Sequence, residues 1–591
     1  MTRPPTSIDL RVDAYETIAS ETANHLPRET GGILLGYQEN RTIVATHALV
    51  VEGQGTTNDR YVRDDVRANK LLKEFLEQRA DGDPIGYVGE WHSHPSPSGP
   101  SPIDHVAMRA TAKDSSNPIA LLVFAPGETD AFFGLIARRQ RFGRATTKEA
   151  IISLPPPRFD PLGPLPDGAV RSDGPVFISY RQPEGNAQAD ALEDLLRAAG
   201  FVVWRDHTDL PPGTTIDRLE QALTGGLSAG ILVVTPDIAN SVIVRERELP
   251  RLLQLDADPN FNLCIANTVA RPGVDSECDY GAPDRLLRLA PARTLAGKKQ
   301  TNMRQPSGEI EIACDLLRGL VRRTKPVIRA EGRDFTIRVQ SRPAASALDG
   351  DGDDLHIRIK PSANGRLPSQ EGLELLQKTL PLISDAVFTA GAKCVRISGG
   401  AHLAVGLALG AALPETKLGK VAVVDVADNV WTSASPDNGL QSSDLMIEPA
   451  QVDRDQAVAS KHRVAVFVTL TSQPDRAAFE QLVSDPAVGF DAAETISVAG
   501  AERVDPREAG HLSVEVAREI RRLSASQGRG EVHLAFHGPL PMAVLLGCRL
   551  NTLRTVVYEW DNRVDDGPFY RPVIVLEPGV AGGPITHVVS Q

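Results

Sequence analysis

The stretch GEWHSHPSPSGPSPID, residues 89–104, places two histidines two positions apart and continues with proline, serine and glycine. Side chains two apart on an extended strand point to the same face, so His92 and His94 can direct both imidazoles at one point. The run that follows disfavours regular structure and predicts a turn. This turn either only reverses the chain or joins two parts of a metal site.

The end of the same stretch has the pattern of a helix start. Ser101 suits the N-cap, Pro102 suits the first helical position, and Asp104 falls in the first turn. Such a start would bring the Asp104 carboxylate near the two imidazoles. Two histidines and one carboxylate leave a fourth position of a zinc ion open for water, as a catalytic site requires. Glu29, which precedes Gly31 at the start of an expected strand, is the candidate general base.

A purely structural interpretation of these residues stays open beside the metal site. Ser101 and Asp104 would then serve only as a helix cap, and the two histidines would be hydrogen-bonded polar residues. Glutamate, HxH, serine and aspartate in this order favour the metal site over the structural interpretation.

The same set resembles the JAB/MPN (JAMM) family of zinc isopeptidases, over about residues 8–150. The resemblance implies a mixed α/β fold in which Glu29 activates water and Ser101 helps to stabilise the oxyanion. It also implies that zinc is held by His92, His94 and Asp104. One departure is visible, since six residues separate His94 from Ser101 where the family usually has seven.

The composition bounds the class of protein. With 591 residues the chain has room for about three to five domains. A net charge of -13 argues against a general DNA or RNA coat, because phosphate binding requires surplus lysine and arginine. The scattered cysteines, an N-terminus without an apolar core and the lack of a run near the ~20 apolar residues of a membrane helix predict a cytoplasmic protein without a membrane segment.

A proline-rich segment, SLPPPRFDPLGPLPDGAVRSDG at residues 153–174, divides the chain and predicts a semi-rigid linker. Before it, GGILLGY, TIVATHALVV and IALLVFAP predict strands around the helical pattern DDVRANKLLKEFLEQRA. After it, strand and helix alternate, which is typical of a parallel α/β sheet. We expect domains at residues 1–152, 174–325 and 326–591, with the linker at residues 153–173.

The phrases VFISYR, FVVWRDHTDLPPGTTI and GILVVTPD resemble the first strand, the second strand with its loop, and the central strand of the TIR domain. The resemblance covers about residues 174–325 and implies a flavodoxin-like parallel α/β fold. TIR domains are either adaptors or enzymes that cleave NAD+, so the resemblance implies NAD+ as a substrate if the catalytic carboxylate is present.

The TIR enzymes carry that carboxylate on the helix after the central strand. Here Glu248, in RELP, matches the position best and Glu246 is the alternative; two residues apart on a helix, they cannot share a face. The other interpretation of Glu248 is a solvated charge in a stretch rich in arginine and glutamate. Tyr180, Arg181 and Asp206 are weaker candidates for contacts to NAD+.

The last part of the chain contains an internal repeat. VRISGGAHLAVGLALGAAL…KVAVVDV (395–426) resembles VHLAFHGPLPMAVLLGCRL…TVVYEWD (532–561). Each copy predicts a strand, a turn with glycine, a helix with Leu-Gly and a second strand. Two related α/β halves would place matching turns about a cleft, at the carboxyl ends of strands where open α/β sheets bind ligands.

This part, over about residues 326–591, resembles the SAVED domain through LHIRIKPS, the two repeat phrases and the end VVYEWDN…FYRPVIVL. The resemblance implies two fused CARF-like, Rossmann-like halves that bind a cyclic oligonucleotide. Turn N–H groups at helix starts attract phosphate, although the glycines could equally serve only to permit tight packing. The candidate ligand contacts are Ser398, Gly399, Gly400, His402, His537, Gly538, Arg358 and Lys360.

The TIR–SAVED order resembles effectors of CBASS, the bacterial anti-phage systems that signal through cyclic oligonucleotides. The resemblance implies that a second messenger such as cyclic tri-adenylate fills the SAVED cleft and drives head-to-tail self-association into oligomers or filaments. Neighbouring TIR domains would then complete active sites that destroy NAD+. The zinc domain would trim conjugates of a nucleotide cyclase, a task of separate JAB proteins in related systems.

Two other functions stay open at this point. The chain could be a zinc-dependent protease whose access is regulated by TIR and SAVED assembly. It could also be a scaffold without enzymatic activity, in which TIR is an assembly module and the zinc site is degenerate because of the short His94–Ser101 loop.

Overall fold

A computed structural model describes residues 5–590 except residues 26, 54–60, 80–82, 97, 126–130, 141–143, 155–161, 183, 206–214, 288–293, 296, 343–351, 417–418, 435–444, 453–461, 472–474, 499–503, 551, 564–566, 578 and 581. The chain divides into two compact units, residues 1–160 and 161–591. Among the described helices, none has the length and apolar character needed to cross a bilayer.

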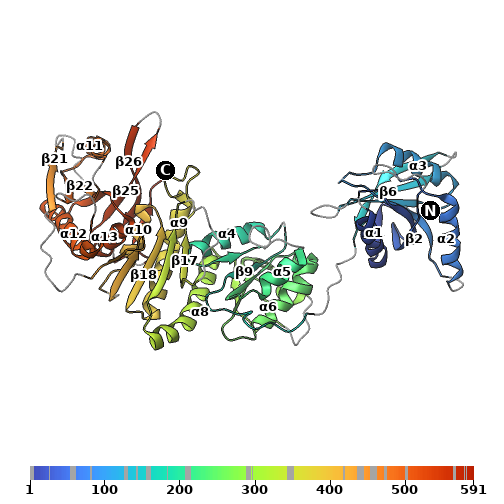
Figure 1. The fold of residues 1–591 in the computed structure, drawn as a ribbon, viewed down its shortest axis with the longest axis horizontal. Helices are drawn as coiled ribbons and strands as arrows, with labels where there is room; N and C mark the ends of the chain where they lie inside the picture. The colour runs from blue at the N-terminus through green and yellow to red at the C-terminus, as the bar shows by residue number, and fades with distance from the viewer. Residues whose placement is uncertain are drawn as a thin grey trace. The chain divides into compact units, whose positions relative to one another are not determined.

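The first unit is one mixed sheet with three helices (Figure 1). Its strand order is β7-β6-β5-β4-β2-β3-β1-β8. The phrases expected to be strands form β2, β3 and β5, and the long helical pattern forms α2, so these predictions are confirmed. The elements are β1 (Ser7–Leu10), α1 (Val12–His25), β2 (Gly31–Glu39), β3 (Thr42–Val50), α2 (Asp65–Glu77), β4 (Gly86–Ser93), α3 (Pro102–Asp114), β5 (Ile119–Ala125), β6 (Ala131–Arg139), β7 (Ala145–Glu149) and β8 (Ile151–Ser153).

Two faces of this sheet are covered by different helices. Trp91, Leu34 and Leu122 belong to the cluster that includes residues of α1, while Leu121 clusters with Met108 of α3. Alternation along a strand sends successive side chains to opposite faces. The strand β4 therefore turns Trp91 toward one layer and its neighbour His92 toward the other.

The second unit begins with a parallel sheet of order β10-β9-β11-β12-β15. Numbered along the chain this order is 2-1-3-4-5, the flavodoxin-like arrangement that the resemblance implied. The elements are β9 (Val176–Ser179), α4 (Asn186–Ala198), β10 (Val203–Trp204), α5 (Thr215–Thr224), β11 (Ala229–Val234), a 3-10 turn (Ile238–Asn240), a π-helix (Val244–Glu248), α6 (Leu249–Leu255), β12 (Asn262–Asn267), the hairpin β13 (Ala270–Arg271) and β14 (Val274–Cys278), α7 (Ala282–Leu287), β15 (Gln300–Asn302) and α8 (Gly308–Glu331).

The end of the proline-rich segment packs against the region of this parallel sheet. Val170 forms a bridge with Leu227, and the amide of Arg171 donates to the Leu227 carbonyl. Ala169 is buried in the cluster that holds Leu219 and Phe177. Part of the expected linker, residues 155–161, lies outside the described residues. The segment from Leu165 onward packs against the apolar cluster that holds Phe177 and Leu219.

Two further sheets follow, and they share one topology. The first has the order β17-β16-β18-β19-β20 and the second contains β23-β22-β24-β25-β26, each with four parallel strands and an antiparallel fifth. The repeat predicted from sequence is therefore confirmed and extends one strand pair upstream of the matching phrases.

The elements of the first half are β16 (Phe335–Gln340), β17 (Leu355–Arg358), α9 (Gln370–Ala390), β18 (Cys394–Gly400), α10 (Leu403–Ala412), β19 (Lys420–Val424) and β20 (Val430–Thr432). Those of the second half are β21 (Leu445–Ala450), β22 (Arg463–Thr469), α11 (Arg476–Val483), β23 (Ala492–Val498), a 3-10 turn (Pro506–Glu508), α12 (Ala509–Ser526), β24 (Glu531–His537), α13 (Leu540–Arg549), β25 (Thr555–Arg563), β26 (Gly567–Leu576) and β27 (Ile585–Val588).

The two halves meet through α10 and α13, which occupy equivalent places in the repeat. A Cβ on Gly410 of α10 would lie 2.0 Å from the Val544 carbonyl oxygen, and a Cβ on Gly547 of α13 would lie 2.3 Å from the Leu407 carbonyl oxygen. Gly410 aligns with Gly547 in the repeat, and Leu407 aligns with Val544. These reciprocal contacts relate the two helices by an approximate two-fold axis. They also explain why both repeats have glycine here, since a side chain would prevent the close approach.

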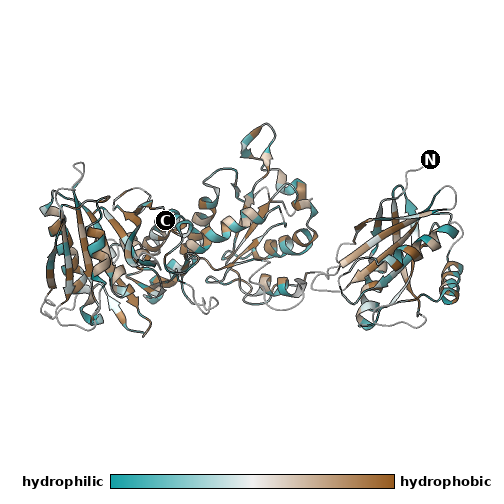
Figure 2. Ribbon diagram, turned by 90° about the horizontal axis from the view of Figure 1, so that it is seen from above, coloured by the Kyte–Doolittle hydropathy of each residue, from teal (hydrophilic) through white to brown (hydrophobic). Residues whose placement is uncertain are grey.

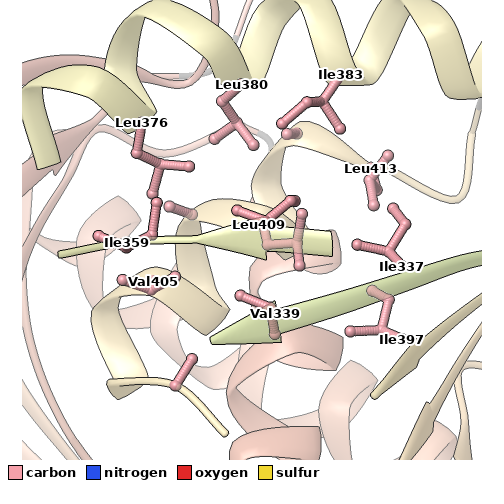
Figure 3. Packing of buried hydrophobic residues seen from close by; sticks show 14 of the residues in the cluster. Ile337, Val339, Ile359, Leu376, Leu380, Ile383, Ile397, Val405, Leu409 and Leu413 are labelled. Carbon is pink, nitrogen blue, oxygen red and sulfur yellow. The ribbon is translucent and has the colours of Figure 1, made fainter. Parts of the chain in front are cut away.

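The core of the first half lies between one face of its sheet and the helices α9 and α10 (Figure 3). Leu376, Leu380 and Ile383 of α9 face the strand residues Ile337 and Ile397, and all five are buried. Val405 and Leu409 of α10 lie in the same cluster. The strands of the sheets are mostly hydrophobic, while the helices mix hydrophobic and hydrophilic residues (Figure 2).

This core continues without a break into the sheet of residues 176–302. One cluster of buried hydrophobic residues contains members of β9, α4 and α8 as well as of both repeat halves. The Thr379 hydroxyl of α9 donates to the Ala198 carbonyl at 3.1 Å, and the His356 amide donates to the Gly200 carbonyl at 2.7 Å. Gly200 has φ +96°, and a Cβ there would lie 2.9 Å from Leu355. The second unit is thus one packed body.

Candidate functional site

Three ligand-type side chains converge in the first unit. One ligand atom from each of His92, His94 and Asp104 lies within 4.8 Å of the others. The two Nε2 atoms are 3.1 Å apart, and Asp104 Oδ1 is 3.7 Å from His92 Nε2. The strand β4 therefore directs both imidazoles at one point, as the two-residue spacing predicted.

The helix start brings in the carboxylate. Ser101 caps α3: its hydroxyl accepts the Asp104 amide at 3.3 Å, while Asp104 Oδ2 accepts the Ser101 amide at 2.6 Å. One Asp104 oxygen thus completes the cap and the other faces His92. The cap and the metal interpretation therefore use different oxygens of the same carboxylate.

The surroundings of the triad fit a zinc ion. His94 Nδ1 lies 2.8 Å from the Ser98 hydroxyl and 3.0 Å from the Ser98 carbonyl, which leaves Nε2 as the inward ligand atom. Burial is the main cause that lowers the pKa of His92 to about 4, so this imidazole is the neutral form that zinc requires. Glu29 is buried two residues before β2, with Oε1 3.9 Å from His94 Nε2. Two imidazoles and a carboxylate of this kind suit zinc with an open fourth position.

A second carboxylate is buried in the other unit. Glu248 ends the π-helix that follows β11, is 4% exposed, and accepts a hydrogen bond from the Ser179 hydroxyl. Ser179 is the last residue of β9. In this strand order β9 and β11 flank the point where the order reverses, and ligands bind at the carboxyl ends of strands there. The π-helix itself is a feature often found at functional sites.

The alternative carboxylate has a different environment. The side chain of Glu246 is 55% exposed and lies 3.8 Å from the guanidinium of Arg245. Of the two candidates, Glu248 is the one that the fold brings to the ends of the strands. Pro250 lies in the first turn of α6, where the helix restarts after the π-helix.

Of the weaker candidates, Tyr180 and Arg181 lie beside Ser179 and Asp206 lies outside the described residues. Tyr180 is buried, and its hydroxyl accepts from Arg205 at 3.2 Å. Arg181 pairs with Glu184 and lies 3.7 Å from Asp237, after β11.

The candidate ligand residues of the first repeat half gather at the carboxyl edge of its sheet. Ser398, Gly399 and Gly400 end β18, where Gly399 has φ +108° and packs its Cα against the Val339 carbonyl. The first turn of α10 follows. His402 is fully buried, its Nδ1 lies 2.8 Å from the Ser341 hydroxyl, and burial lowers its pKa to about 4.

The other predicted residues are more scattered. His537 ends β24 in the second half and Gly538 follows it, and the Leu470 amide donates to the His537 carbonyl. Arg358 ends β17, and Lys360 beyond it lies 3.3 Å from Glu371 and 3.9 Å from Asp194 of α4. Lys360 is therefore an ion-pair partner at the border with α4.

Several polar residues at these edges were not predicted from sequence. Glu559 of β25 is buried, its carboxylate accepts the Ala404 amide at 2.6 Å in the first turn of α10, and burial raises its pKa to about 7. Within the described part of the chain, the hydroxyls of Thr469 and Thr471 are buried without a hydrogen-bond partner, as is Nδ1 of His537, which was predicted. A lone acidic residue inside the apolar strand VVYEWD was the signal for Glu559; threonines closing VAVFVTLT were the signal for the others.

Three family models match this chain in order. Prokaryotic homologs of the JAB domain match residues 11–138, the TIR domain matches residues 176–268, and the SMODS-associated and fused to various effectors sensor domain, SAVED, matches residues 375–576. No curated protein matches the chain.

Solved structures match parts of the fold at low identity. Protein DSY2949 from Desulfitobacterium hafniense is 17% identical with a TM-score of 0.20, covering 25% of this chain and 92% of its own. The Cap4 SAVED/CARF-domain containing receptor of Acinetobacter baumannii, solved with the cyclic trinucleotide 3'3'3'-cAAA, is 11% identical with a TM-score of 0.34, covering 68% of this chain and 88% of its own. The same receptor with 2'3'3'-cAAA is 12% identical with a TM-score of 0.33, covering 61% and 83%.

Proposed function

We propose that this chain, which carries regions matching JAB, TIR and SAVED family models in that order, is a ligand-activated effector of the CBASS type. A cyclic oligonucleotide binds the SAVED region, the chain self-associates, and the TIR region hydrolyses NAD+. The observation that carries the proposal is the buried Glu248 carboxylate, held by Ser179 at the carboxyl ends of β9 and β11.

The proposed chemistry uses a carboxylate where positive charge develops. Loss of nicotinamide from NAD+ leaves an oxocarbenium-like ribose, and a fixed carboxylate stabilises it in a site of low dielectric. Ser179 holds Glu248 in one orientation, which lowers the cost of reorganisation. Tyr180 and Arg181, next along the chain, would contact the ribose or the phosphates.

The proposed sensor is the pair of carboxyl edges in the repeat halves. N–H groups at the start of α10 and unpaired threonine hydroxyls at the end of β22 are donors suited to phosphate oxygens and base edges. Glu559 links the halves at this place, because β25 belongs to the second half and α10 to the first. A ligand that competes for the α10 amides would have to displace this carboxylate, which ties binding to a rearrangement between the halves. A cyclic tri-adenylate is the first ligand to test.

Self-association follows from the resemblance to TIR–SAVED effectors and completes the proposal. A heterologous contact that does not close on itself gives filaments rather than rings. Neighbouring TIR regions in such a filament would complete each other's sites. A scaffold without NAD+ hydrolysis would assemble in the same way, so turnover has to be measured beside assembly.

The first unit is proposed to be a zinc peptidase that trims conjugates of a nucleotide cyclase. His92, His94 and Asp104 would hold the ion, which lowers the pKa of a bound water and polarises the scissile carbonyl. Glu29 would accept the proton of the attacking water, and the Ser101 hydroxyl would donate to the developing oxyanion. The convergence of the three ligand atoms is the observation that favours this second activity.

The deciding experiment measures NAD+ loss by the purified chain with and without a panel of cyclic oligonucleotides. Glu248→Gln is the test variant, and Glu246→Gln is its matched control because it removes an equal charge two residues away. Ligand-dependent loss that only Glu248→Gln abolishes supports the proposal. Ligand binding without NAD+ loss would reduce the TIR region to an assembly module and leave the zinc peptidase as the effector.

A further inference from the structure

A groove extends from the metal-ligand triad across the sheet of the first unit. It encloses about 560 Å³ and contains Glu29, His92, His94 and Asp104 together with residues that the peptidase chemistry does not use. Its floor is formed by β4 and β5, and its walls are residues 61–65 on one side and α3 on the other. The part beyond the triad is where a substrate chain would continue.

Glu90 lies on the floor of this groove. It precedes His92 by two residues on β4, in regular pairing with Ile33 of β2, so both side chains share a face. Glu90 Oε1 accepts from Arg63 Nη1 at 2.8 Å and from the Tyr87 hydroxyl at 3.2 Å. Its side chain is 20% exposed. Two fixed donors therefore hold a carboxylate in one orientation while part of it stays open to the groove.

The charges around Glu90 do not cancel. Arg63 also donates to Asp65, with Nε at 2.9 Å and Nη2 at 2.6 Å from Oδ1. One guanidinium thus serves two carboxylates, and the cluster keeps one surplus negative charge. Because the Asp65 side chain is 73% exposed and the Glu90 side chain is not, the charge in the groove is that of Glu90.

Part of the groove lining is apolar. Ile103 of α3 is 74% exposed at the rim, and the buried Met108 and Leu121 line the interior. An apolar lining beside the Glu90 carboxylate suits an extended peptide that carries a basic side chain, since an aliphatic stem packs on the apolar side chains while its cationic end reaches the acid. It does not suit a polyanion such as a nucleotide.

We propose that Glu90 is a specificity-determining residue that selects a lysine or arginine of the substrate two positions from the scissile bond. The distance follows from strand geometry, because two residues span about 7 Å on β4 and an extended substrate chain has the same rise. This inference rests on the proposed peptidase function of the first unit. It names the substrate class as an extended peptide segment with a basic residue beside the cleavage point.

The test uses fluorescent nonapeptides of alanine and glycine in which one arginine is moved through every position. Binding to the zinc-loaded, full-length Glu29→Gln variant is followed by anisotropy, and cleavage by the unmodified chain is mapped by mass spectrometry. We expect arginine at one position to tighten binding by about tenfold, and Glu90→Gln to remove that gain. Asp65→Asn is the matched control: it removes an equal charge from the same arginine, and the gain should persist.

The outcomes separate this inference from the peptidase proposal. Cleavage without any preference for arginine, or a preference that Asp65→Asn removes as fully as Glu90→Gln, overturns the role of Glu90 while the peptidase stands. Binding of the arginine peptide that depends on Glu90 but is never followed by cleavage supports the role of Glu90 and counts against the peptidase. If no peptide binds a chain that retains one zinc per molecule, the inference fails.

Discussion

At the scale of residues, Asp104 both caps α3 and faces the proposed metal site, and the sequence alone could not separate these two roles. The capping pattern and the ligand pattern share the same side chain, and sequence alone left both interpretations open. In the structure one oxygen accepts the Ser101 amide and the other faces His92. The two duties can therefore be separated by mutation.

Asp104→Asn should weaken zinc binding by at least tenfold, because an amide is a poor ligand, while its oxygen can still accept the Ser101 amide and keep the cap. Ser101→Ala should do the reverse: zinc binding persists and the free energy of unfolding falls by about 1 kcal/mol. A competitive titration with a chromogenic chelator and a denaturant curve measure the two effects. Equal zinc binding in both variants would restore the purely structural interpretation.

The buried His402 predicts how the free energy of unfolding depends on pH. Burial lowers the pKa of His402 to about 4 from an ordinary value near 6.5, so the unfolded chain binds a proton that the folded chain does not. Stability attributable to His402 is therefore complete above pH 6.5 and is lost progressively as pH falls toward 4. At pH 5.5 the loss amounts to about 1 kcal/mol.

Urea unfolding at pH 7.5 and pH 5.5 checks this value. In His402→Gln the decrease in unfolding free energy between the two pH values should be smaller by about 1 kcal/mol than in the unmodified chain. His25→Gln serves as the control for loss of a histidine, because the His25 side chain at the end of α1 is 48% exposed. An unchanged decrease in His402→Gln would show that the proton is taken up elsewhere.

At the scale of elements, apolar runs predicted the strands of both units. The internal repeat predicted that the last part of the chain consists of two related α/β halves. Sequence predicted the capped start of α3 and the strand β4 because each depends on neighbouring residues along the chain. What sequence did not indicate depends on distant partners. Ser179 meets Glu248 across 69 residues, and Glu559 reaches Ala404 across 155. Contacts of this kind follow from packing, which no short pattern encodes.

The helix pair α10 and α13 gives the prediction at this scale. Gly410→Ala and Gly547→Ala should each lower the free energy of unfolding by about 3 kcal/mol or more, because the added methyl meets backbone that cannot yield. Gly406→Ala is the control on the same helix: its Cβ would first meet the Leu540 side chain, which can move. Chemical denaturation of the three variants measures the difference.

A smaller effect in Gly410→Ala than in Gly406→Ala would contradict the close crossing. The double variant provides a further check, because both glycines allow the same close helix crossing. Once one alanine has forced the helices apart, the second lowers the free energy of unfolding by less. The combined loss should therefore be smaller than the sum of the single losses.

At the scale of the whole molecule, the compact units do not coincide with the three family matches. The TIR and SAVED matches fall in one body with a continuous apolar core, whereas residues 1–160 form a unit of their own. Composition changes located the proline-rich division of the chain. They could not reveal the shared core, because a buried interface between two domains has the same composition as the interior of one.

Truncation tests this arrangement. A chain of residues 161–591 should fold with a single cooperative transition and keep any ligand response, since its core is complete. Chains of residues 162–331 and 332–591, expressed separately, should aggregate or melt at lower temperature, because the cut exposes apolar surface around Ala198 and Gly200 in the first and around Leu355 and Thr379 in the second. Calorimetry and light scattering compare them. Two stable, monomeric halves would contradict the shared core.

The continuity of that core also constrains how such a chain could arise by gene recombination. A crossover near residue 160 transfers residues 1–160 as an intact compact unit. A crossover near residue 331 would pair the apolar face of α9 with an α4 that evolved beside a different partner, so a new SAVED region could be acquired only together with its TIR region. Lineages should therefore gain and lose the amino-terminal module freely while inheriting the TIR and SAVED regions as a single locus.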